Sequence, residues 1–262
     1  NEPIIQYIVI VFMFLAGSNF VLSYFALTGK VQRILKDEEF KYYFGFVVVF
    51  SILAALGVYF KADVPVSDFH PMVWGKAESA FRHTLFQVLT VITTTGFVTA
   101  DFTGWTHFLT VFFFGLMFLG GSAGSTAGGI KVMRHILIIK NGILEFKRTL
   151  HPNAIIPVRY NQKTVTEHIV YNVIAFFVLY MLLFIIGALV LGFLGLDFIS
   201  AVGGSASSLG NVGPAFGSLN PVSNYNSLPD AGKWWCGFLM LLGRLELFTV
   251  LIVLTPYFWK KT

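Results

Sequence analysis

Charge and cysteine, which most soluble proteins contain in quantity, are both scarce in this sequence. Charged residues make up 12% of the 262 residues, about half of the usual share for a soluble domain. Hydrophobic residues make up 56%, which excludes a cytosolic enzyme, a nucleic-acid-binding module and a disordered tail. The single cysteine, Cys236, excludes an internal disulfide framework. These shortages predict a protein that crosses a membrane several times.

Five apolar segments have the length of about 20 residues or more that a membrane-crossing helix needs. They are Ile4–Leu27, Tyr42–Phe60, His107–Ile139, His168–Leu194 and Lys233–Trp259. Two further segments, Ala77–Thr93 and Phe198–Leu209, are too short or too polar to cross. We expect Ser18 and Asn19, inside the first span, to hydrogen-bond to neighbouring helices. The predicted fold is an all-α polytopic membrane protein.

The positions of lysine and arginine predict which side of the membrane is cytoplasmic. Of the 18 basic residues, four lie between the first two spans, seven at the end of or after the third, and two at the end of the chain. Five spans place all of these on one side, which should face the cytoplasm together with the C-terminus. The outer loops hold Lys61, Lys76, Arg82 and Lys233. Because topology explains the basic residues, we expect contact with the lipid bilayer and no nucleic acid.

One pattern occurs twice after the first span: a span, a short amphipathic segment, a polar strip containing glycine, and a second span. The strips are Thr93–Phe97 and Gly210–Pro214. Non-helical backbone at membrane depth is tolerated only against protein or water, so two such strips indicate an aqueous path. Glycine lets successive carbonyl oxygens point to one side, and such oxygens can replace the water around a monovalent cation. Ordinary external loops are the alternative, which the repetition disfavours.

The third span is interrupted by a glycine-rich stretch, with six glycines among the fifteen residues Gly115–Gly129. Each glycine weakens a helix by about 0.5–1 kcal/mol relative to alanine, so we expect a broken helix. Close helix packing is an alternative use of small residues in membranes. A Gly-x-Ser-x-Gly pattern around Ser122 also fits a serine nucleophile formally. His107 and His135 lie too far along the same segment to activate that serine, which disfavours an intramembrane protease.

Two charged residues, Arg244 and Glu246, lie inside the last predicted span. A charge at that depth is costly unless it is paired or hydrated, and it marks a functional candidate. Arg244, near the middle of the span, would lower cation occupancy beneath the strips or donate to carbonyls freed by the glycine-rich break. The six histidines show no metal-ligand spacing, so we expect no metal beyond a transported ion.

At three places the sequence resembles the TrkH/KtrB family of potassium-uptake transporters, and TrkH more than KtrB. These are Thr93–Phe97 followed by Asp101, the stretch Phe118–Lys131, and Asn211–Pro214 with Arg244. Members of this family carry four repeats of helix, re-entrant half-helix and helix around one pore. The resemblance divides the chain into the end of repeat two with a cytoplasmic loop (1–39), repeat three (40–141), a basic cytoplasmic loop (142–164) and repeat four (165–262).

The resemblance also implies roles for individual residues. It assigns the potassium selectivity filter to Thr94, Thr95, Gly96, Phe97, Asn211, Val212, Gly213 and Pro214. It assigns an intramembrane gate to Gly120, Gly121, Gly124, Gly128 and Gly129, with Arg244 facing the pore. It further implies potassium uptake across a bacterial inner membrane, no enzymatic activity, no bound cofactor, a homodimer, and a TrkA-like cytosolic nucleotide-binding subunit.

Two strips cannot encircle an ion. We therefore expect the chain to begin inside a longer protein, with two further strips upstream; supply of the missing half by another chain is the alternative. Within transport, a secondary cation-coupled carrier with discontinuous helices is the other candidate, and it would show inverted repeats. The sequence leaves open the preference for K+ over Na+ and the choice between channel and symporter.

Overall fold

The computed structural model describes residues 2–61, 74–154, 156–245 and 247–259, and this part of the chain is mostly helical. The helices are α1 (Pro3–Gly17), α2 (Phe20–Leu27), α3 (Val31–Lys36), α4 (Glu38–Lys61), α5 (Lys76–Ile92), α6 (His107–Leu116), α7 (Val132–Leu150), α8 (Glu167–Phe193), α9 (Phe198–Gly210), α10 (Asp230–Arg244), α11 (Leu247–Leu254) and α12 (Pro256–Trp259). A small hairpin pairs β1 (Arg159–Tyr160) with β2 (Lys163–Thr164), and 3₁₀ turns lie at Gly217–Leu219 and Tyr225–Ser227. The predicted all-α class is confirmed.

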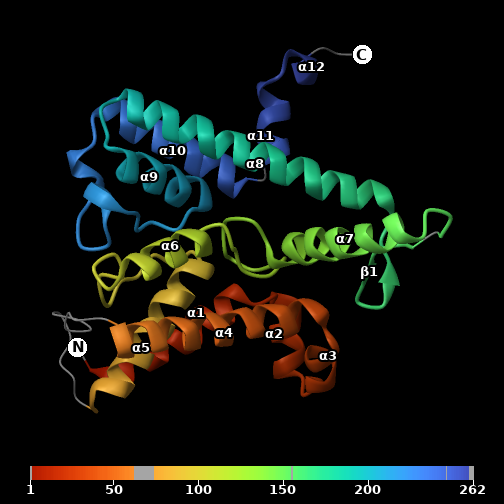
Figure 1. The fold of residues 1–262 in the computed structure, drawn as a ribbon, viewed down its shortest axis with the longest axis horizontal. Coiled ribbons are helices and arrows are strands. Elements are labelled where there is room, and N and C mark those ends of the chain that lie inside the picture. Colours follow the sequence, from red (N-terminus) through yellow and green to blue (C-terminus); the bar gives the residue numbers. More distant parts are fainter. Residues whose placement is uncertain (1, 62–73, 155, 246, 260–262) are drawn as a thin grey trace.

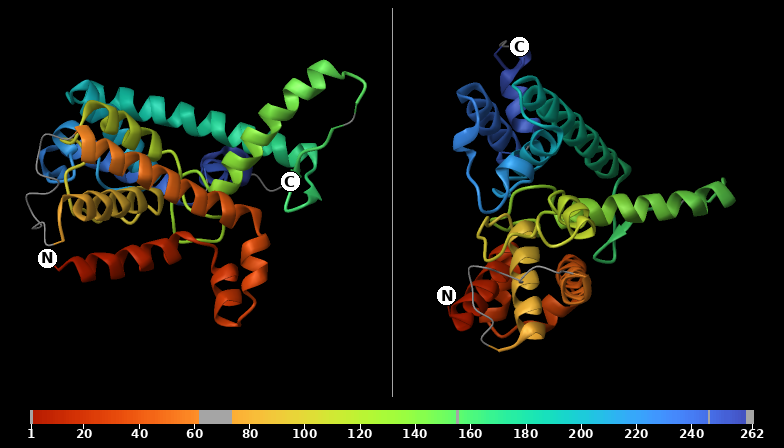
Figure 2. Two further views of the ribbon diagram at one scale, coloured as in Figure 1. Left: turned by 60° about the horizontal axis from the view of Figure 1, so that its bottom comes forward. Right: turned by 60° about the vertical axis from the view of Figure 1, so that its left-hand side comes forward.

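Two groups of helices lie on either side of the segment formed by α6 and α7 (Figure 1). One group contains α1 to α5, and the other contains α8 to α11. Within the groups, α4 packs against α5 and α8 packs against α9, so each long helix is paired with the short helix that follows it. The two views of Figure 2 show the same division. The repeat predicted from the sequence is therefore visible as two similar helix pairs.

Helices α4 and α8 are each long and apolar enough to cross a bilayer without interruption. They correspond to the second and fourth predicted spans. Their outward faces carry exposed apolar side chains, such as Ile52 on α4 and Leu182 and Leu189 on α8. Exposed aliphatic side chains along a helix of this length fit contact with lipid.

The first and fifth predicted spans are not continuous helices. Each is a pair of helices bent by 115°, α1 with α2 and α10 with α11. At the first bend, the Asn19 side chain caps α2 by accepting a hydrogen bond from the Val21 N–H at 2.8 Å. Ser18 Oγ donates to the carbonyl of Leu15 at 2.7 Å. Ser18 Oγ also lies 3.2 Å from Ser23 Oγ of α2, so the expected bond to a neighbouring helix is found for Ser18, whereas the side chain of Asn19 caps its own helix.

The third predicted span is broken, as expected from its glycines. Helix α6 ends at Leu116 and α7 begins at Val132, and residues 117–131, here called the glycine loop, join them without helix. Helix α7 runs beyond the predicted end of the span at Ile139 and reaches Leu150. The segment 142–164, predicted as a basic loop, thus holds the last turns of α7 and the hairpin.

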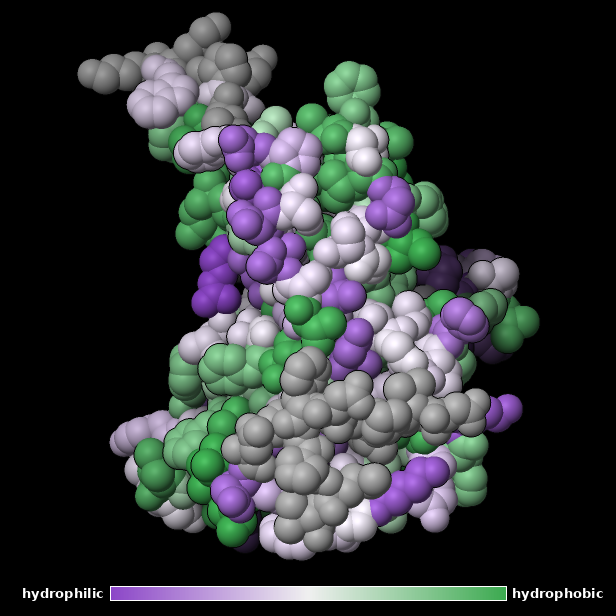
Figure 3. Space-filling view, turned by 90° about the vertical axis from the view of Figure 1, so that its left-hand side faces the viewer, coloured by the Kyte–Doolittle hydropathy of each residue, from purple (hydrophilic) through white to green (hydrophobic). Residues whose placement is uncertain are grey.

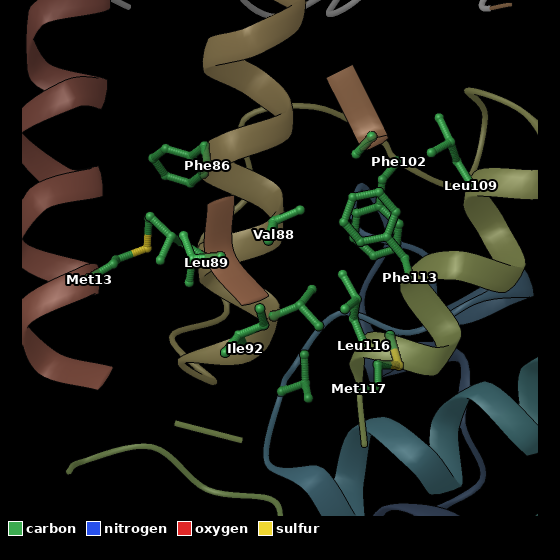
Figure 4. Close-up of a cluster of buried hydrophobic side chains, with 14 of the residues drawn as sticks. Met13, Phe86, Val88, Leu89, Ile92, Phe102, Leu109, Phe113, Leu116 and Met117 are labelled. Carbon is green, nitrogen blue, oxygen red and sulfur yellow. The ribbon is translucent and has the colours of Figure 1, made fainter. Parts of the chain in front are cut away.

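The buried apolar side chains that hold the first group together come from α1, α5 and α6 (Figure 4). Met13 of α1 points toward α5, where Phe86 and Leu89 are buried. Phe113 of α6 is fully buried, and its ring centroid lies 4.7 Å from that of Phe102. Burial of each such side chain is worth about 1.5–3 kcal/mol, and it fixes α5 against the start of the glycine loop.

We expect Phe113→Ala to lower the free energy of unfolding by about 3–5 kcal/mol, because it removes a buried ring and leaves a cavity. Phe108→Ala on the same helix is the matched control, since that side chain is 64% exposed. The apparent Tm of the detergent-purified protein measures both. Equal Tm values for the two variants would contradict the packing described for α6.

Candidate functional site

The two polar strips, Thr93–Phe97 and Gly210–Pro214, meet. A Cβ placed on Gly213 would lie 3.6 Å from the Cα of Gly96, and a Cβ on Gly96 would lie 3.0 Å from the carbonyl oxygen of Val212. Each strip follows directly on a short helix, α5 or α9, which match the two predicted non-spanning segments. The structure therefore brings together two stretches that are far apart in the sequence.

The two strips share one backbone conformation. In the first, Thr94 has φ +52° and Gly96 has φ +81°; in the second, Asn211 has φ +58° and Gly213 has φ +102°. The residue between each pair has an ordinary negative φ. Left-handed φ is rare for a β-branched residue such as Thr94 and marks local strain. Glycine and asparagine adopt left-handed φ more readily, so the strain lies at Thr94, where surrounding contacts hold it.

The hydrogen bonds at the ends of α5 and α9 also correspond. The N–H of Thr95 donates to the carbonyl of Thr90 at 3.0 Å, and the N–H of Val212 donates to that of Ser207 at 2.9 Å. The ends of both helices therefore close in the same way. Their last carbonyls carry a partial negative charge, and both helices direct that charge at the junction of the strips.

The strips contain no acidic residue. The nearest one in sequence, Asp101, accepts hydrogen bonds from the N–H and Oγ1 of Thr103, at 2.9 and 2.6 Å. Its carboxylate is therefore engaged in its own turn. Within the strips, negative partial charge therefore comes from backbone carbonyls and the ends of α5 and α9.

The glycine loop lies directly against both strips. The N–H of Gly128 donates to Thr94 Oγ1 at 2.7 Å, which also holds the strained threonine in place. A Cβ on Gly128 would lie 2.8 Å from the carbonyl oxygen of Gly210 and 2.9 Å from the Cβ of Asn211. Only glycine fits this approach without displacing backbone. Of the predicted gate glycines, Gly128 touches both strips, and Gly129 lies beside the carbonyl of Gly210.

The other end of the loop bonds to the bend in the first span. The N–H of Ser122 donates to the carbonyl of Gly17 at 2.9 Å, and that of Thr126 donates to Ala16 at 3.3 Å. The N–H of Phe20 donates in return to the carbonyl of Gly124 at 3.2 Å. A bend leaves helix-end groups without partners. The loop satisfies these groups, which explains how an apolar segment can bend here.

The remaining gate glycines shape the loop itself. Gly120 N–H donates to the carbonyl of Ile130 at 2.8 Å and so joins the two ends of the loop. A Cβ on Gly121 would lie 2.8 Å from both Ala127 Cβ and the carbonyl oxygen of Gly17. Gly124 has φ +71° and faces Asn19. All five glycines predicted as gate residues therefore lie in one loop, and a Cβ on Gly120, Gly121 or Gly128 would come within 3.0 Å of another atom.

Arg244 is the last residue of α10 and lines a cavity of about 170 Å³ with the glycine loop. Sequence analysis placed it near the middle of a span, whereas it lies at the end of a helix. The same cavity is lined by Lys131 and Arg134; Lys131 Nζ donates to the carbonyl of Ala127, and the Arg134 guanidinium lies 3.6 Å from the ring centroid of Phe176. Glu246 lies outside the described residues. Three cationic side chains thus line the same cavity as the glycine loop.

Tyr225 was missed by sequence analysis. Its hydroxyl donates to the carbonyl oxygen of Gly213 at 2.8 Å, so one lone pair of that oxygen is engaged. Burial raises the pKa of Tyr225 to about 12, which keeps the phenol a hydrogen-bond donor at neutral pH. Asn211 is held by a bond from its Nδ2 to the carbonyl of Met240 at 3.1 Å. A tyrosine in a polar loop carries no sequence pattern that points to this contact.

Arg82 was also placed wrongly. Counted among outer-loop basic residues, it is fully buried in α5, where its Nε lies 2.7 Å from Glu78 Oε1 and its Nη1 donates to Gln6 of α1. Next to it, His83 Nδ1 lies 3.0 Å from Thr99 Oγ1. This polar network ties α1 and α5 to the segment that follows the first strip. A buried charge survives only when it is paired in this way.

The serine of the Gly-x-Ser-x-Gly pattern has no catalytic surroundings. Ser122 is buried, and the hydrogen bonds of the described residues include none between it and a histidine. In the described part of the chain, no group of three or more His, Cys, Asp or Glu residues is placed to hold a metal ion. The face at the left of Figure 1 shows hydrophilic residues down the middle of its upper half, with hydrophobic residues at the sides (Figure 3).

We expect Gly128→Ala to destabilise the protein, because the added Cβ would meet backbone atoms of Gly210 at 2.8 Å. The cost should be about 1–3 kcal/mol, as for other overpacked sites. Gly115→Ala is the matched control, since a Cβ there would meet no atom within 4 Å. Thermal unfolding in detergent compares them, and an unchanged Tm for Gly128→Ala would show that the loop does not rest against the strip.

Two short helices, α5 and α9, each end in a polar strip, and the two strips meet. The third predicted span is broken by the glycine loop. Together these features define a pore-loop membrane protein. The chain matches the model of the TrkH family, described as cation transport protein, over residues 1–260, and it belongs to that family. It is 33% identical to the Trk system potassium uptake protein TrkH of Escherichia coli K12, across all of this chain and 52% of that protein. It is 35% identical to TrkH of Vibrio parahaemolyticus, across 98% of this chain and 51% of that protein.

The structure agrees with this placement. The crystal structure of the potassium transporter TrkH from Vibrio parahaemolyticus superposes with a TM-score of 0.87 at 33% identity, covering 99% of this chain and 54% of that one. The chain spans about half the length of the curated relatives it matches. The predicted family resemblance is confirmed, and the prediction of a non-enzyme agrees with the transporter names of these relatives.

Proposed function

We propose that the protein moves potassium ions across a membrane and that the junction of the two strips is part of the ion path. The meeting of Gly96 and Gly213 carries this proposal. Support comes from the names of the relatives, which are potassium uptake proteins and a potassium transporter. The chain matches about half of each relative, so the transport activity belongs to a larger assembly that includes these two repeats.

In this proposal the ion loses its water to carbonyl oxygens of the strips. The filter residues are Thr94, Thr95, Gly96 and Phe97 in one repeat and Asn211, Val212, Gly213 and Pro214 in the other. Carbonyl oxygens held by a strained backbone cost no reorganisation when the ion arrives, and they favour a monovalent cation. The negative ends of α5 and α9 add attraction at the same point. No cofactor is required, since K+ itself is the cargo.

The glycine loop is the proposed gate. The loop contacts the first strip through the hydrogen bond from the Gly128 N–H to Thr94 Oγ1. Loop residues also line a cavity together with Arg244. An ion leaving the strips therefore meets the loop first and the cationic side chains next. Movement of the loop away from Thr94 would open the path, and Arg244 would set the electrostatic barrier behind it.

We also propose the membrane arrangement and partners that the family resemblance implies. The basic side of the helices would face the cytoplasm of a bacterial inner membrane, with the C-terminus inside. The name Trk system, borne by the relatives, fits an assembly of several components. A homodimer and a TrkA-like cytosolic nucleotide-binding subunit are the proposed components.

We expect Gly96→Ser to reduce uptake of rubidium ion, a K+ substitute, at least tenfold or to remove the preference for K+ over Na+. Gly96 has φ +81°, and an added Cβ would lie 3.0 Å from the carbonyl oxygen of Val212, so the strip must distort. Gly104→Ser is the matched control, because a Cβ there would make only an ordinary contact at 3.9 Å. Uptake and selectivity of Gly96→Ser equal to those of the control would refute a filter role for the strip.

We expect Arg244→Gln to raise the maximal flux severalfold, because it removes a positive charge from the cavity beneath the loop. The increase should be larger at low ionic strength, where charges are least screened. Lys233→Gln is the control, because this lysine lies at the other end of α10 and forms an exposed pair with Asp230. Flux through reconstituted vesicles at two salt concentrations tests this, and a loss of flux would place Arg244 in a structural role.

A further inference from the structure

Glu39 is a buried carboxylate that the proposed ion path does not use. It lies in the first turn of α4 and is 4% exposed. Its Oε1 accepts a hydrogen bond from the N–H of Ala123 at 2.6 Å, and its Oε2 accepts one from the hydroxyl of Tyr160 at 3.3 Å. The positive end of the α4 dipole stabilises a negative charge at this position. Each oxygen therefore serves a different part of the chain.

One of these parts is the glycine loop. Ala123 lies between Ser122, which bonds to the bend of the first span, and Gly124, which accepts from Phe20. Hydrogen bonds to a charged acceptor are roughly twice as strong as neutral ones. Glu39 thus provides the charged contact in a set of backbone bonds that hold the loop in place.

The other part is the hairpin that follows α7. Its tip docks on the corner before α4: the N–H of Asn161 donates to Glu38 Oε2 at 2.9 Å, and its Nδ2 donates to Asp37 Oδ2 at 2.9 Å. Asn161 Oδ1 accepts in return from the N–H of Glu38 at 2.7 Å. Tyr160, next to this tip, is the residue that reaches Glu39.

A second connection runs from the hairpin to the far end of the loop. Lys140 of α7 donates to the carbonyl of Arg159 at 2.9 Å and forms an ion pair with Glu38. Helix α7 begins directly after the glycine loop. The hairpin is therefore tied both to the middle of the loop, through Glu39, and to the helix that continues it.

We propose that the hairpin β1–β2 is a latch on the glycine loop, and that Glu39 is the positioning residue that transmits its hold. With Tyr160 seated on Glu39, the loop stays against Thr94 and the path is closed. When the hairpin is displaced on the predicted cytoplasmic side, Glu39 loses its hydrogen bond from Tyr160 and holds Ala123 less firmly. The loop can then move away from Thr94. This latch rests on the proposed function, because it needs the loop to be the gate.

The test measures rubidium flux into vesicles that contain the intact protein. Tyr160→Phe removes the hydroxyl that bonds to Glu39 and keeps the ring. We expect it to raise maximal flux about three- to tenfold, the shift that loss of one such hydrogen bond makes in a two-state equilibrium. The concentration for half-maximal flux and the K+ over Na+ preference should stay unchanged, because the strips are not touched.

Two controls make the same chemical change elsewhere. Tyr171→Phe removes a hydroxyl from a side chain that is 67% exposed on α8, and Glu167→Gln neutralises an exposed carboxylate at the start of that helix. Both should behave like the unmodified protein.

Glu39→Gln keeps an acceptor for the Ala123 N–H, so it should raise flux less than Glu39→Ala. The double variant Glu39→Ala with Tyr160→Phe should equal Glu39→Ala alone, since residues in one chain of contacts are not additive.

A flux for Tyr160→Phe equal to that of Tyr171→Phe, or below it, overturns the latch. A change in K+ over Na+ preference also overturns it, because that result would show a general distortion of the strips. The proposed function is judged separately, by cation flux of the unmodified protein and by Gly96→Ser. The unmodified protein could show flux, and Gly96→Ser could alter its selectivity, while Tyr160→Phe changes nothing. That result would support the proposed ion path and refute the latch.

Discussion

Every interruption of a helix inside a bilayer frees polar backbone groups that lipid cannot satisfy, and this constraint organises the whole molecule. Among the described residues, three such interruptions lie against one another: the bend after Gly17, the glycine loop, and the paired strips. Each satisfies another. The loop donates to Ala16 and Gly17 at the bend, and its Gly128 N–H donates to Thr94 in a strip. The loop is the element that hydrogen-bonds to both of the others.

Backbone groups of one interruption can hydrogen-bond to those of another only where the two backbones approach closely. This requirement explains where the glycines lie. A Cβ on Gly128 would lie 2.8 Å from the carbonyl oxygen of Gly210, which leaves no room for a side chain, and a Cβ on Gly96 would lie 3.0 Å from the carbonyl oxygen of Val212. Glycines elsewhere, such as Gly115 and Gly142, face open space and are there for other reasons. Composition alone cannot separate these two groups. A glycine matters here when another interruption stands opposite it, which is a property of the fold.

The same distinction divides what the sequence predicts from what it cannot. The half-helices α5 and α9, the strips and the broken third span were predictable, because short length, polarity and repeated glycines are local signals. The bends after Gly17 and Arg244 were not, because the apolar stretches on either side of a few polar residues have the combined length of one span. Glu39, Arg82 and Tyr225 escaped for a related reason: each is a single polar residue whose role comes from contacts with residues elsewhere in the chain.

Charge is distributed unequally along the proposed ion path. The glycine loop lies between the negative partial charges of the strips and a group of positive side chains. On one side, the carbonyl ends of α5 and α9 favour a cation. On the other, Arg244, Lys131 and Arg134 line the cavity behind the loop. A cation held at the strips is attracted where it sits and repelled from the next position. If the loop is the gate, as proposed, it would need to move only slightly to control flow, because the cationic side would already oppose entry when the loop is closed.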